Sequence, residues 1–150
     1  MKAGENSCIG VTRGGKTTKI HALVNSQGMP VRFLLSAGNR EDFDEAIPLL
    51  EQVPDLSGSR ILGDKAYGTK KVRGYIQNRG GCYTIPPTKN LREPWQYDKF
   101  AYRRRNVIER FFCRLKQFRR VATRYDKRAS SFRAFLLVSA ISILFALLHN

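Results

Sequence analysis

The sequence predicts an α/β domain. Two early segments have the two-residue period of strands, short strands then alternate with helical segments, and long helical segments follow. The chain has 150 residues, of which 42% are apolar and 11% aromatic, enough to fill a buried core. Its 27 Lys and Arg outnumber 12 Asp and Glu, giving a net charge of +15. This excess indicates a polyanionic partner, with nucleic acid before an anionic membrane or an acidic protein.

The first elements predict a basic arm, a hairpin and a helix. Residues 1–16 are polar and Gly-rich, which is typical of an irregular arm. Alternating apolar residues predict strands over 17–25 and 31–35, joined by a Gly-containing turn into an antiparallel hairpin. A helix is expected over 41–53, where acidic residues in the first turns complement the helix dipole, although Pro48 is expected to disturb it.

The second half of the chain predicts short alternating elements and then two long helices. In order, they are a strand at 60–63, a helix at 69–79, a strand at 82–85, a polar loop at 86–98, a helix at 101–123 and a last helix capped by Ser130 or Ser131. Apolar residues at three- and four-residue steps predict the core stripe of the 101–123 helix: Ile108, Phe111, Leu115, Phe118 and Ala122.

These elements predict an arm (1–16), a body (17–128) and a C-terminal apolar helix (129–150) packed on the same body. Residues 134–148 carry no charge, but they fall short of the roughly 18 to 20 apolar residues that cross a bilayer. A buried helix is therefore favoured over a membrane anchor. The start of the chain has no apolar signal-peptide region, and its three cysteines form no paired motif. We expect a cytoplasmic protein without a membrane span.

The string GVTRGGKT at residues 10–17 satisfies the P-loop pattern for nucleotide binding. A P-loop needs an apolar strand before its glycines and a helix directly after them. Here the preceding residues are polar, and the following ones have the period of a strand. The favoured interpretation is a flexible basic loop in which Arg13 and Lys16 lie along a phosphate backbone.

Two carboxylates, Asp64 and Glu109, are candidates for a catalytic or metal-binding role. Asp64 follows an apolar strand, so it is either a catalytic carboxylate at the rim of a sheet or a turn aspartate. Glu109 lies in the most basic stretch, residues 102–128, which holds nine Arg and two Lys against Glu109 and Asp126. It is either a surface ion-pair partner or a metal ligand between cations that hold phosphates.

A second stripe on the 101–123 helix carries polar and aromatic residues at helical spacing: Tyr102, Arg105, Glu109, Phe112, Cys113 and Lys116. Four of these residues reproduce the Y-(2)-R-(3)-E-(6)-K signature, and the stretches RGGKTTKIHALVNSQGMPVRFLL, ILGDKAYGT, YTIPPTKN and FFCRLKQFRRVATRYDK match in order. The chain thus resembles the DDE-class insertion-sequence transposases, in particular the IS-five-like group, from about Gly10 to the last helix.

The resemblance implies an RNase H-like fold, a mixed sheet of five strands flanked by helices. In this family two Asp and one Glu hold two Mg²⁺ or Mn²⁺ ions, which cleave DNA at insertion-sequence ends and transfer the strand. Asp64 and Glu109 would be the second and third ligands. Tyr102, Arg105 and Lys116 would grip phosphates near the cleaved bond. The resemblance also implies a homo-oligomer in the complete enzyme.

The first aspartate of the family pattern is absent. Before Glu41 the only acidic residue is Glu5, in a polar arm without strand character, which makes it a poor substitute. We therefore expect an N-terminally truncated domain whose first strand is missing, so that the 17–35 hairpin loses its link to the strand ending at Asp64. Such a fragment would be inactive alone, and the upstream half of the transposase is an expected partner.

The remaining predicted DNA contacts lie outside the signature. Trp95 either stacks on an unpaired base or packs its loop against the core, and packing is favoured. The basic run of Arg119, Arg120, Arg124, Lys127 and Arg128 is either a solvated face or a DNA track, and the small number of acidic residues nearby favours the track. Two other functions stay open. A non-catalytic basic DNA-binding protein derived from a transposase would explain the charge, and a membrane-bound protein would explain the last helix.

Overall fold

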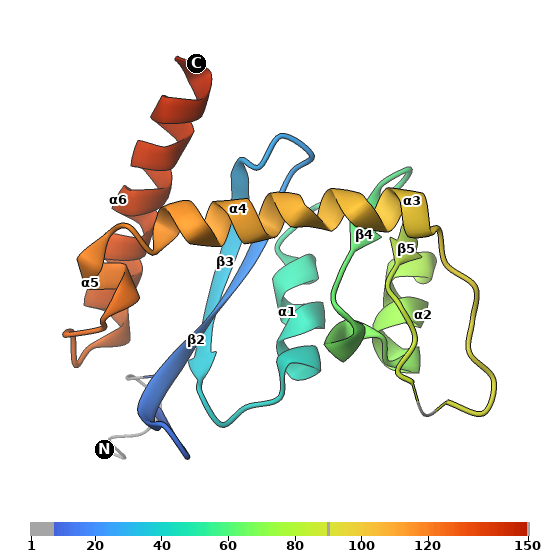
Figure 1. Cartoon of the computed structure of the whole chain (residues 1–150), viewed down its shortest axis with the longest axis horizontal. Coiled ribbons are helices and arrows are strands. Elements are labelled where there is room, and N and C mark those ends of the chain that lie inside the picture. Colours follow the sequence, from blue (N-terminus) through green and yellow to red (C-terminus); the bar gives the residue numbers. More distant parts are fainter. Residues whose placement is uncertain (1–7, 90, 150) are drawn as a thin grey trace. The chain divides into compact units, whose positions relative to one another are not determined.

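The chain folds into two compact units (Figure 1). The computed structural model describes residues 8–89 and 91–149. Unit 1 consists of Met1–Arg40 and Val107–Asn150, and unit 2 is the continuous segment Glu41–Asn106. The mixture of small sheets and helices confirms the predicted α/β class.

The sheet of unit 1 is an antiparallel meander of β1 (Gly10–Thr12), β2 (Gly15–Val24) and β3 (Pro30–Ala37). Ala22 lies opposite Phe33 in the β2–β3 hairpin. The predicted hairpin is therefore confirmed.

The turn between β2 and β3 is held by a side chain. The Asn25 side-chain oxygen accepts hydrogen bonds from the amides of Gln27 and Met29, each 3.0 Å long. Gly28 supplies a φ of +84°, a conformation that costs glycine little because it has no Cβ. The turn is therefore formed by two nearby residues, Asn25 and Gly28.

The prediction of an irregular arm over residues 1–16 is wrong from Gly10 onward. There β1 pairs with the start of β2, with Thr12 opposite Gly15. Gly15 adopts a φ of +101°, and the Thr12 hydroxyl donates to the Gly15 carbonyl over 3.1 Å. The segment that matches the P-loop pattern is therefore a tight β-hairpin. Its residues are mostly polar and exposed, so they lack the apolar alternation by which a strand is predicted.

The prediction of one continuous helix over 101–123 is also wrong. The segment consists of α3 (Lys99–Tyr102), a 3₁₀ turn (Arg103–Arg105), α4 (Asn106–Leu115) and α5 (Arg119–Ala122). Phe118 is extended, with φ −78° and ψ 101°, so α5 starts in a new direction. As a result Val121 is buried and Ala122, the last residue of the predicted stripe, is exposed.

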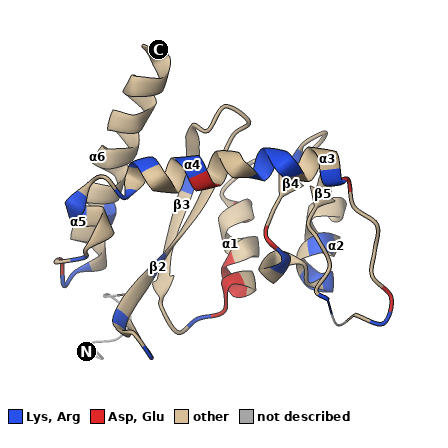
Figure 2. Cartoon of the chain, in the orientation of Figure 1, with Lys and Arg blue, Asp and Glu red and all other residues tan. Residues whose placement is uncertain are grey.

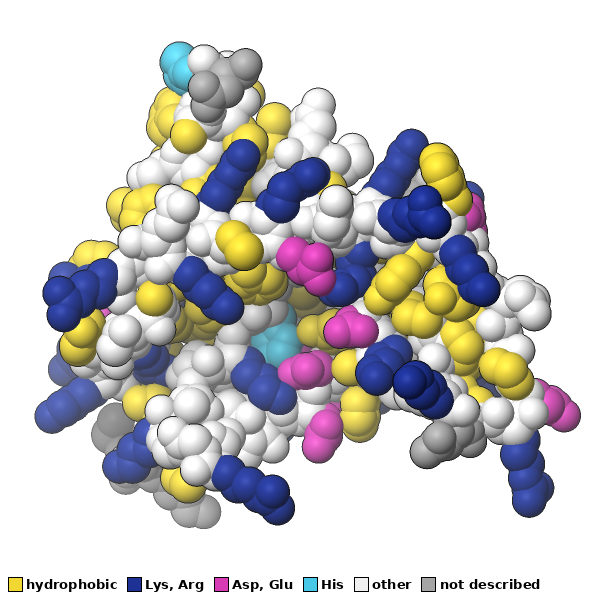
Figure 3. All heavy atoms as spheres, viewed as in Figure 1, with side chains coloured by type: hydrophobic (Ala, Val, Ile, Leu, Met, Phe, Trp, Pro, Cys, Tyr) yellow, Lys and Arg dark blue, Asp and Glu magenta, His cyan; other side chains and the backbone are white. Residues whose placement is uncertain are grey.

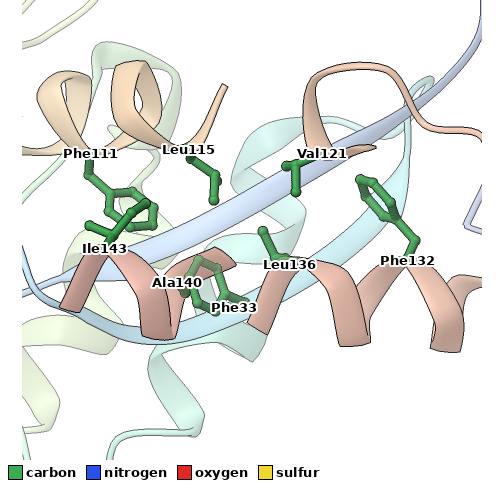
Figure 4. Packing of buried hydrophobic residues seen from close by; sticks show 8 residues of the cluster. All are labelled: Phe33, Phe111, Leu115, Val121, Phe132, Leu136, Ala140 and Ile143. Carbon is green, nitrogen blue, oxygen red and sulfur yellow. The ribbon is translucent and has the colours of Figure 1, made fainter. Parts of the chain in front are cut away.

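The core of unit 1 lies between the β2–β3 hairpin and helices α4, α5 and α6 (Figure 4). It consists of Phe33, Phe111, Leu115, Val121, Phe132, Leu136, Ala140 and Ile143. The rings of Phe33 and Phe111 lie 5.8 Å apart between centroids. Ile108 and Phe118 pack against this cluster, so four of the five predicted stripe residues contribute to the core.

Helix α6 (Ala129–Leu148) starts after Arg128, with no side-chain cap, and not at the predicted Ser130 or Ser131. Its buried residues lie on one side: Phe132, Leu136, Ser139, Ala140 and Ile143. By length and composition α6 could cross a membrane, although core helices of soluble proteins pass the same test. Only 28% of its most apolar stretch is buried, so the helix that was predicted to be buried is buried on one side alone.

Unit 2 alternates short strands and helices much as predicted. Its elements are a 3₁₀ turn (Asp42–Glu45), α1 (Ala46–Glu51), β4 (Arg60–Leu62), a 3₁₀ turn (Lys65–Tyr67), α2 (Lys70–Asn78), β5 (Cys82–Thr84) and α3. Strands β4 and β5 are parallel. Pro48 falls in the first turn of α1, where the missing amide costs no helical hydrogen bond.

The described residues form two separate sheets, β1–β2–β3 and β4–β5. In these residues β4 pairs with β5 alone, and residues 18–24 of β2 pair with β3 alone. An open strand edge presents unpaired amides and carbonyls that can accept a further strand. Each unit therefore has an edge at which a sheet could be extended.

Candidate functional site

Asp64 lies two residues beyond β4, at the start of the 3₁₀ turn Lys65–Tyr67. Its Oδ1 accepts a hydrogen bond of 2.7 Å from the backbone amide of Lys65, so the residue caps this turn. The side chain is exposed. An ionised carboxylate offers about four acceptor positions, so the capping role leaves room for further ligands.

Tyr67, on the same turn, faces two carboxylates. The pKa of its hydroxyl is raised to about 12, mainly by burial and also by the negative charges of Asp42 and Asp64. The 3₁₀ turn that carries Asp42 packs against the turn that carries Tyr67. Tyr67 therefore stays protonated near neutral pH and keeps a hydroxyl proton within electrostatic reach of Asp64.

Asp98 links the start of helix α3 to strand β4. Asp98 caps α3 by accepting from the Ala101 amide over 2.9 Å, and it pairs with Arg60 on β4 over 2.8 Å. The start of α3 is thus tied to the start of the strand that leads to Asp64.

Tyr102 ends α3, and the pKa of its hydroxyl is raised. The largest cause is burial; the cation of Arg105 lowers this pKa, while the charge of Asp64 raises it. The Arg105 guanidinium lies 5.6 Å from the centroid of the Tyr102 ring. Unit 2 therefore places Tyr102 within electrostatic reach of Asp64, with the Arg105 guanidinium beside the Tyr102 ring.

Glu109 and Lys116 belong to unit 1. Glu109 is exposed on α4, and Lys116 is exposed just after that helix ends. The amide of Lys116 still bonds to the Phe112 carbonyl over 2.9 Å, so the helical pattern continues to this residue and both side chains lie on one side of α4. Figure 2 shows the acidic position of α4 between basic ones.

The carboxylates fit a hard metal ion in type but not in number. Carboxylate oxygens are the ligands that Mg²⁺ and Mn²⁺ prefer, and Asp64 and Glu109 each supply one such group. Across residues 8–89 and 91–149, however, no group of three His, Cys, Asp or Glu side chains is placed to hold a metal ion. Glu5 lies outside the described residues.

The basic residues of unit 1 that were predicted to contact DNA are exposed, and one of them, Arg120, also packs against neighbouring side chains. Arg13 lies in the β1–β2 turn, Lys16 at the start of β2 and Arg119 at the start of α5. Arg120 stacks 3.7 Å over the Phe135 ring and pairs with Asp126 at 3.4 Å. Its guanidinium is therefore already engaged in packing α5 on α6.

Arg124, which the basic run placed with the DNA track, has a structural position. It is partly buried; its Nε donates to the Asp126 carbonyl over 2.9 Å, and its guanidinium lies 5.0 Å from the Phe132 ring. It also donates to the Thr18 hydroxyl and to the Cys8 carbonyl. Burial lowers the pKa of Arg124. This side chain ties the sheet to the segment between α5 and α6.

Trp95 packs its loop against the rest of unit 2. Its indole Nε1 donates to the Ile85 carbonyl over 2.8 Å, and the Arg73 guanidinium covers its ring at 3.7 Å from the centroid. This geometry supports the packing interpretation, since one ring face and the indole donor are occupied. Sequence reasoning missed Arg73 and Tyr67, because the contact of Arg73 with Trp95 and the effect of Asp42 on Tyr67 join distant parts of the chain.

A cavity of about 300 Å³ lies beside α6 in unit 1. It is lined by Arg114, Gln117, Phe118, Ser142, Ile143 and Ala146. None of the predicted site residues lines it, so it adds nothing to the site around Asp64.

Comparison with known proteins supports one family. Residues 4–145 match the transposase DDE domain family. A Brucella ovis protein assigned to insertion sequence element IS6501 as its transposase is 30% identical over 128 residues, covering 85% of this chain and 97% of that protein. A Burkholderia cepacia protein assigned to element IS402 is 27% identical over 128 residues, covering 79% of this chain and 58% of that protein.

The chain thus spans nearly the whole of one relative and a little over half of the other. No solved structure is significantly similar to it. The family match covers most of the chain, and the Y-(2)-R-(3)-E-(6)-K residues and Asp64 lie inside the matched range. The chain belongs to the DDE-domain transposases of bacterial insertion sequences.

Proposed function

We propose that this chain carries part of the catalytic site of an insertion-sequence transposase, with Asp64 and Glu109 as two of three metal ligands. The family acts on DNA and generally uses divalent metal ions. Two ions, Mg²⁺ or Mn²⁺, would polarise a DNA phosphate and activate the attacking hydroxyl. The chain's own contribution is two carboxylates, whose oxygens suit such ions.

The observation that supports this proposal most is the grouping around Asp64. Its carboxylate follows a β-strand and lies within electrostatic reach of Tyr102, which Arg105 flanks. An arginine and a tyrosine hydroxyl are donors to phosphate oxygens. A phosphate held by them would lie next to the carboxylate that binds the metal ion.

The other cations would hold the DNA further from the cleaved bond. In this proposal Lys116 contacts a phosphate near Glu109, while Arg13, Lys16, Arg119 and Arg120 contribute to a longer basic track. Trp95 is the weakest of the proposed DNA contacts, since its ring is covered by Arg73.

We also propose that the chain is inactive alone. A site with three carboxylates needs a third acidic residue, and before Glu41 the sequence supplies only Glu5, in the arm. An upstream half that contributes a strand with an aspartate would pair with an open edge of β2 or β4 and complete an RNase H-like sheet. The complete assembly would be a homo-oligomer.

A cleavage assay tests the proposal. The chain is incubated with Mg²⁺ and duplex DNA carrying the insertion-sequence ends, alone and with a polypeptide that supplies the upstream strand. We expect no nicking by the chain alone and nicking by the mixture, lost in Asp64→Ala and in Glu109→Ala. Nicking by the chain alone that both substitutions abolish would contradict the need for a third carboxylate.

A non-catalytic DNA-binding protein is the second candidate. It is favoured by the lack of a three-residue metal group among the described residues. Measuring DNA retention at rising salt concentration, with and without Mg²⁺, separates the two candidate functions. Binding by charge neutralisation alone weakens with salt and does not need Mg²⁺ or the carboxylates. A metal-assisted DNA complex should be weakened by Glu109→Ala in Mg²⁺ but not in EDTA, whereas simple charge binding should respond equally in both.

A further inference from the structure

The side of α6 that faces away from the core is as apolar as the side that covers it. Five large side chains on it, Leu137, Val138, Ile141, Phe145 and Leu148, are between 42% and 60% exposed. Soluble monomers rarely leave so continuous an apolar surface uncovered. Figure 3 shows hydrophobic side chains at the surface along α6.

The exposed residues follow a regular spacing. Ala134, Val138, Ile141, Phe145 and Leu148 recur at steps of four, three, four and three, and all five are exposed. This is the 3.5-residue repeat by which one helix packs along another through knobs and holes. We call these five residues, with Leu137, the α6 seam.

We propose that the α6 seam packs against the α6 seam of a second copy of this chain, antiparallel and across a two-fold axis. A surface that pairs with itself must carry the complementary repeat, and α6 does so along four turns. The five large side chains expose on the order of 500 Å² per copy, so the pair would bury about 1,000 Å², near the lower limit for a specific interface.

The charges at the ends of α6 favour the antiparallel orientation. Arg128 and Arg133 lie at its N-terminal end, and residues 134–148 carry no charge. Parallel packing would bring the four arginines of two copies together. Antiparallel packing places each pair near the partner's C-terminal end, where the helix dipole is negative.

A bilayer is a poorer occupant of this surface. The opposite side of α6 is committed to the core through Phe132, Leu136 and Ile143, so the helix cannot be surrounded by lipid without unfolding unit 1. An amphipathic helix that lies on a membrane carries Lys and Arg along its polar face, and α6 has none between Ala134 and Leu148.

Sedimentation equilibrium of the nuclease-treated chain tests the proposal. We expect a monomer–dimer equilibrium in the micromolar range, weakened at least about tenfold by Ile141→Glu and by Phe145→Glu, since a buried unpaired charge opposes association. Val11→Glu makes the same kind of change at a side chain that is 70% exposed outside the seam, and it should leave the equilibrium unchanged. Circular dichroism checks that each variant is folded.

Cross-linking tests the orientation in a background where Cys8, Cys82 and Cys113 are serine. A mixture of Val138→Cys and Leu148→Cys chains should form a disulfide-linked dimer between unlike copies, while Val138→Cys alone should not. A dimer of Val138→Cys alone would overturn the antiparallel arrangement.

Two results would overturn the seam itself. One is a dimer that Ile141→Glu and Phe145→Glu leave intact. The other is a chain that stays monomeric at all concentrations. If that monomer also floats with phosphatidylcholine vesicles, and Ile141→Glu and Phe145→Glu abolish flotation, the surface binds a membrane instead.

Discussion

The guanidinium of Arg73 lies over the indole ring of Trp95, 3.7 Å from its centroid. Arg73 also bonds to the Gly68 carbonyl and to the Tyr83 hydroxyl, at 3.3 and 3.2 Å. One side chain of α2 therefore joins the long loop of unit 2 to the turn that follows Asp64. The placement of this loop depends on stacking as well as on hydrogen bonds.

Removing the stack should be visible in the emission of Trp95, the single tryptophan of the chain. Arg73→Ala uncovers the ring to water, so we expect the emission maximum to move to longer wavelength and the free energy of unfolding to fall by about 1 to 2 kcal/mol. Arg79→Ala is a control for the spectrum, because Arg79 directly follows the same helix and lies 5.7 Å from the Tyr75 ring. An unchanged spectrum in Arg73→Ala would contradict the stacked geometry.

Gly68 and Gly74 should respond to alanine in opposite directions. A Cβ at Gly68 would lie 3.1 Å from the Lys65 carbonyl oxygen and 3.2 Å from the Trp95 ring. We expect Gly68→Ala to lower the free energy of unfolding by about 1 to 3 kcal/mol. A Cβ at Gly74, inside α2, meets nothing within 4 Å, so Gly74→Ala should raise it by about 0.5 to 1 kcal/mol. Urea denaturation measures both, and equal signs would contradict the packing at Gly68.

Stability should fall at alkaline pH because of Tyr67. Its hydroxyl has a pKa of about 12 in the folded chain against 10.0 for an ordinary tyrosine, so the stabilisation is complete below pH 10 and is lost as the pH rises through 12. Since Tyr67 is only partly buried, we expect the loss to be on the order of 1 to 2 kcal/mol. Tyr67→Phe should flatten the dependence of unfolding on pH in this window, whereas Tyr125→Phe, at a residue that is 60% exposed, should not.

Divalent metal ions should not stabilise the chain by itself. A ligand stabilises a fold according to its concentration relative to its dissociation constant, and no three-residue metal group exists among the described residues. We expect 5 mM Mn²⁺ or EDTA to change the unfolding midpoint by less than about 2 °C. A larger rise that Asp64→Asn removes would reveal a site that this chain completes alone.

Local signals in the sequence were sufficient for most elements. Alternating apolar residues, turn residues and helix caps act over only a few residues. They were enough to predict the β2–β3 hairpin, the strands before Asp64 and Pro86, and the helix that follows Thr69. Thr69 is an example, since its hydroxyl accepts from the Val72 amide over 3.2 Å. The family could also be inferred, because four spaced residues and several ordered blocks coincide.

The failures have a common cause in contacts between distant parts of the chain. The break after Leu115 changes which residue is buried, from Ala122 to Val121, and the helical spacing of the sequence continues through it unchanged. Arg124 looks like its basic neighbours, yet it reaches Thr18 and Cys8 across the fold. The two tyrosines near Asp64 lie on segments held by Asp98 and by the packing of two 3₁₀ turns, which no motif encodes.

Unit 1 is discontinuous along the chain, and this bears on how the protein is made. Phe33 leaves the ribosome long before its ring partner Phe111, because all of Glu41–Asn106 is synthesised between them. Unit 2 is continuous, so it can fold while the β2–β3 hairpin still lacks the helices that cover it. Until residues 107–148 emerge, that hairpin carries its apolar face uncovered, which is the period in which a nascent chain is most exposed to chaperones and to aggregation.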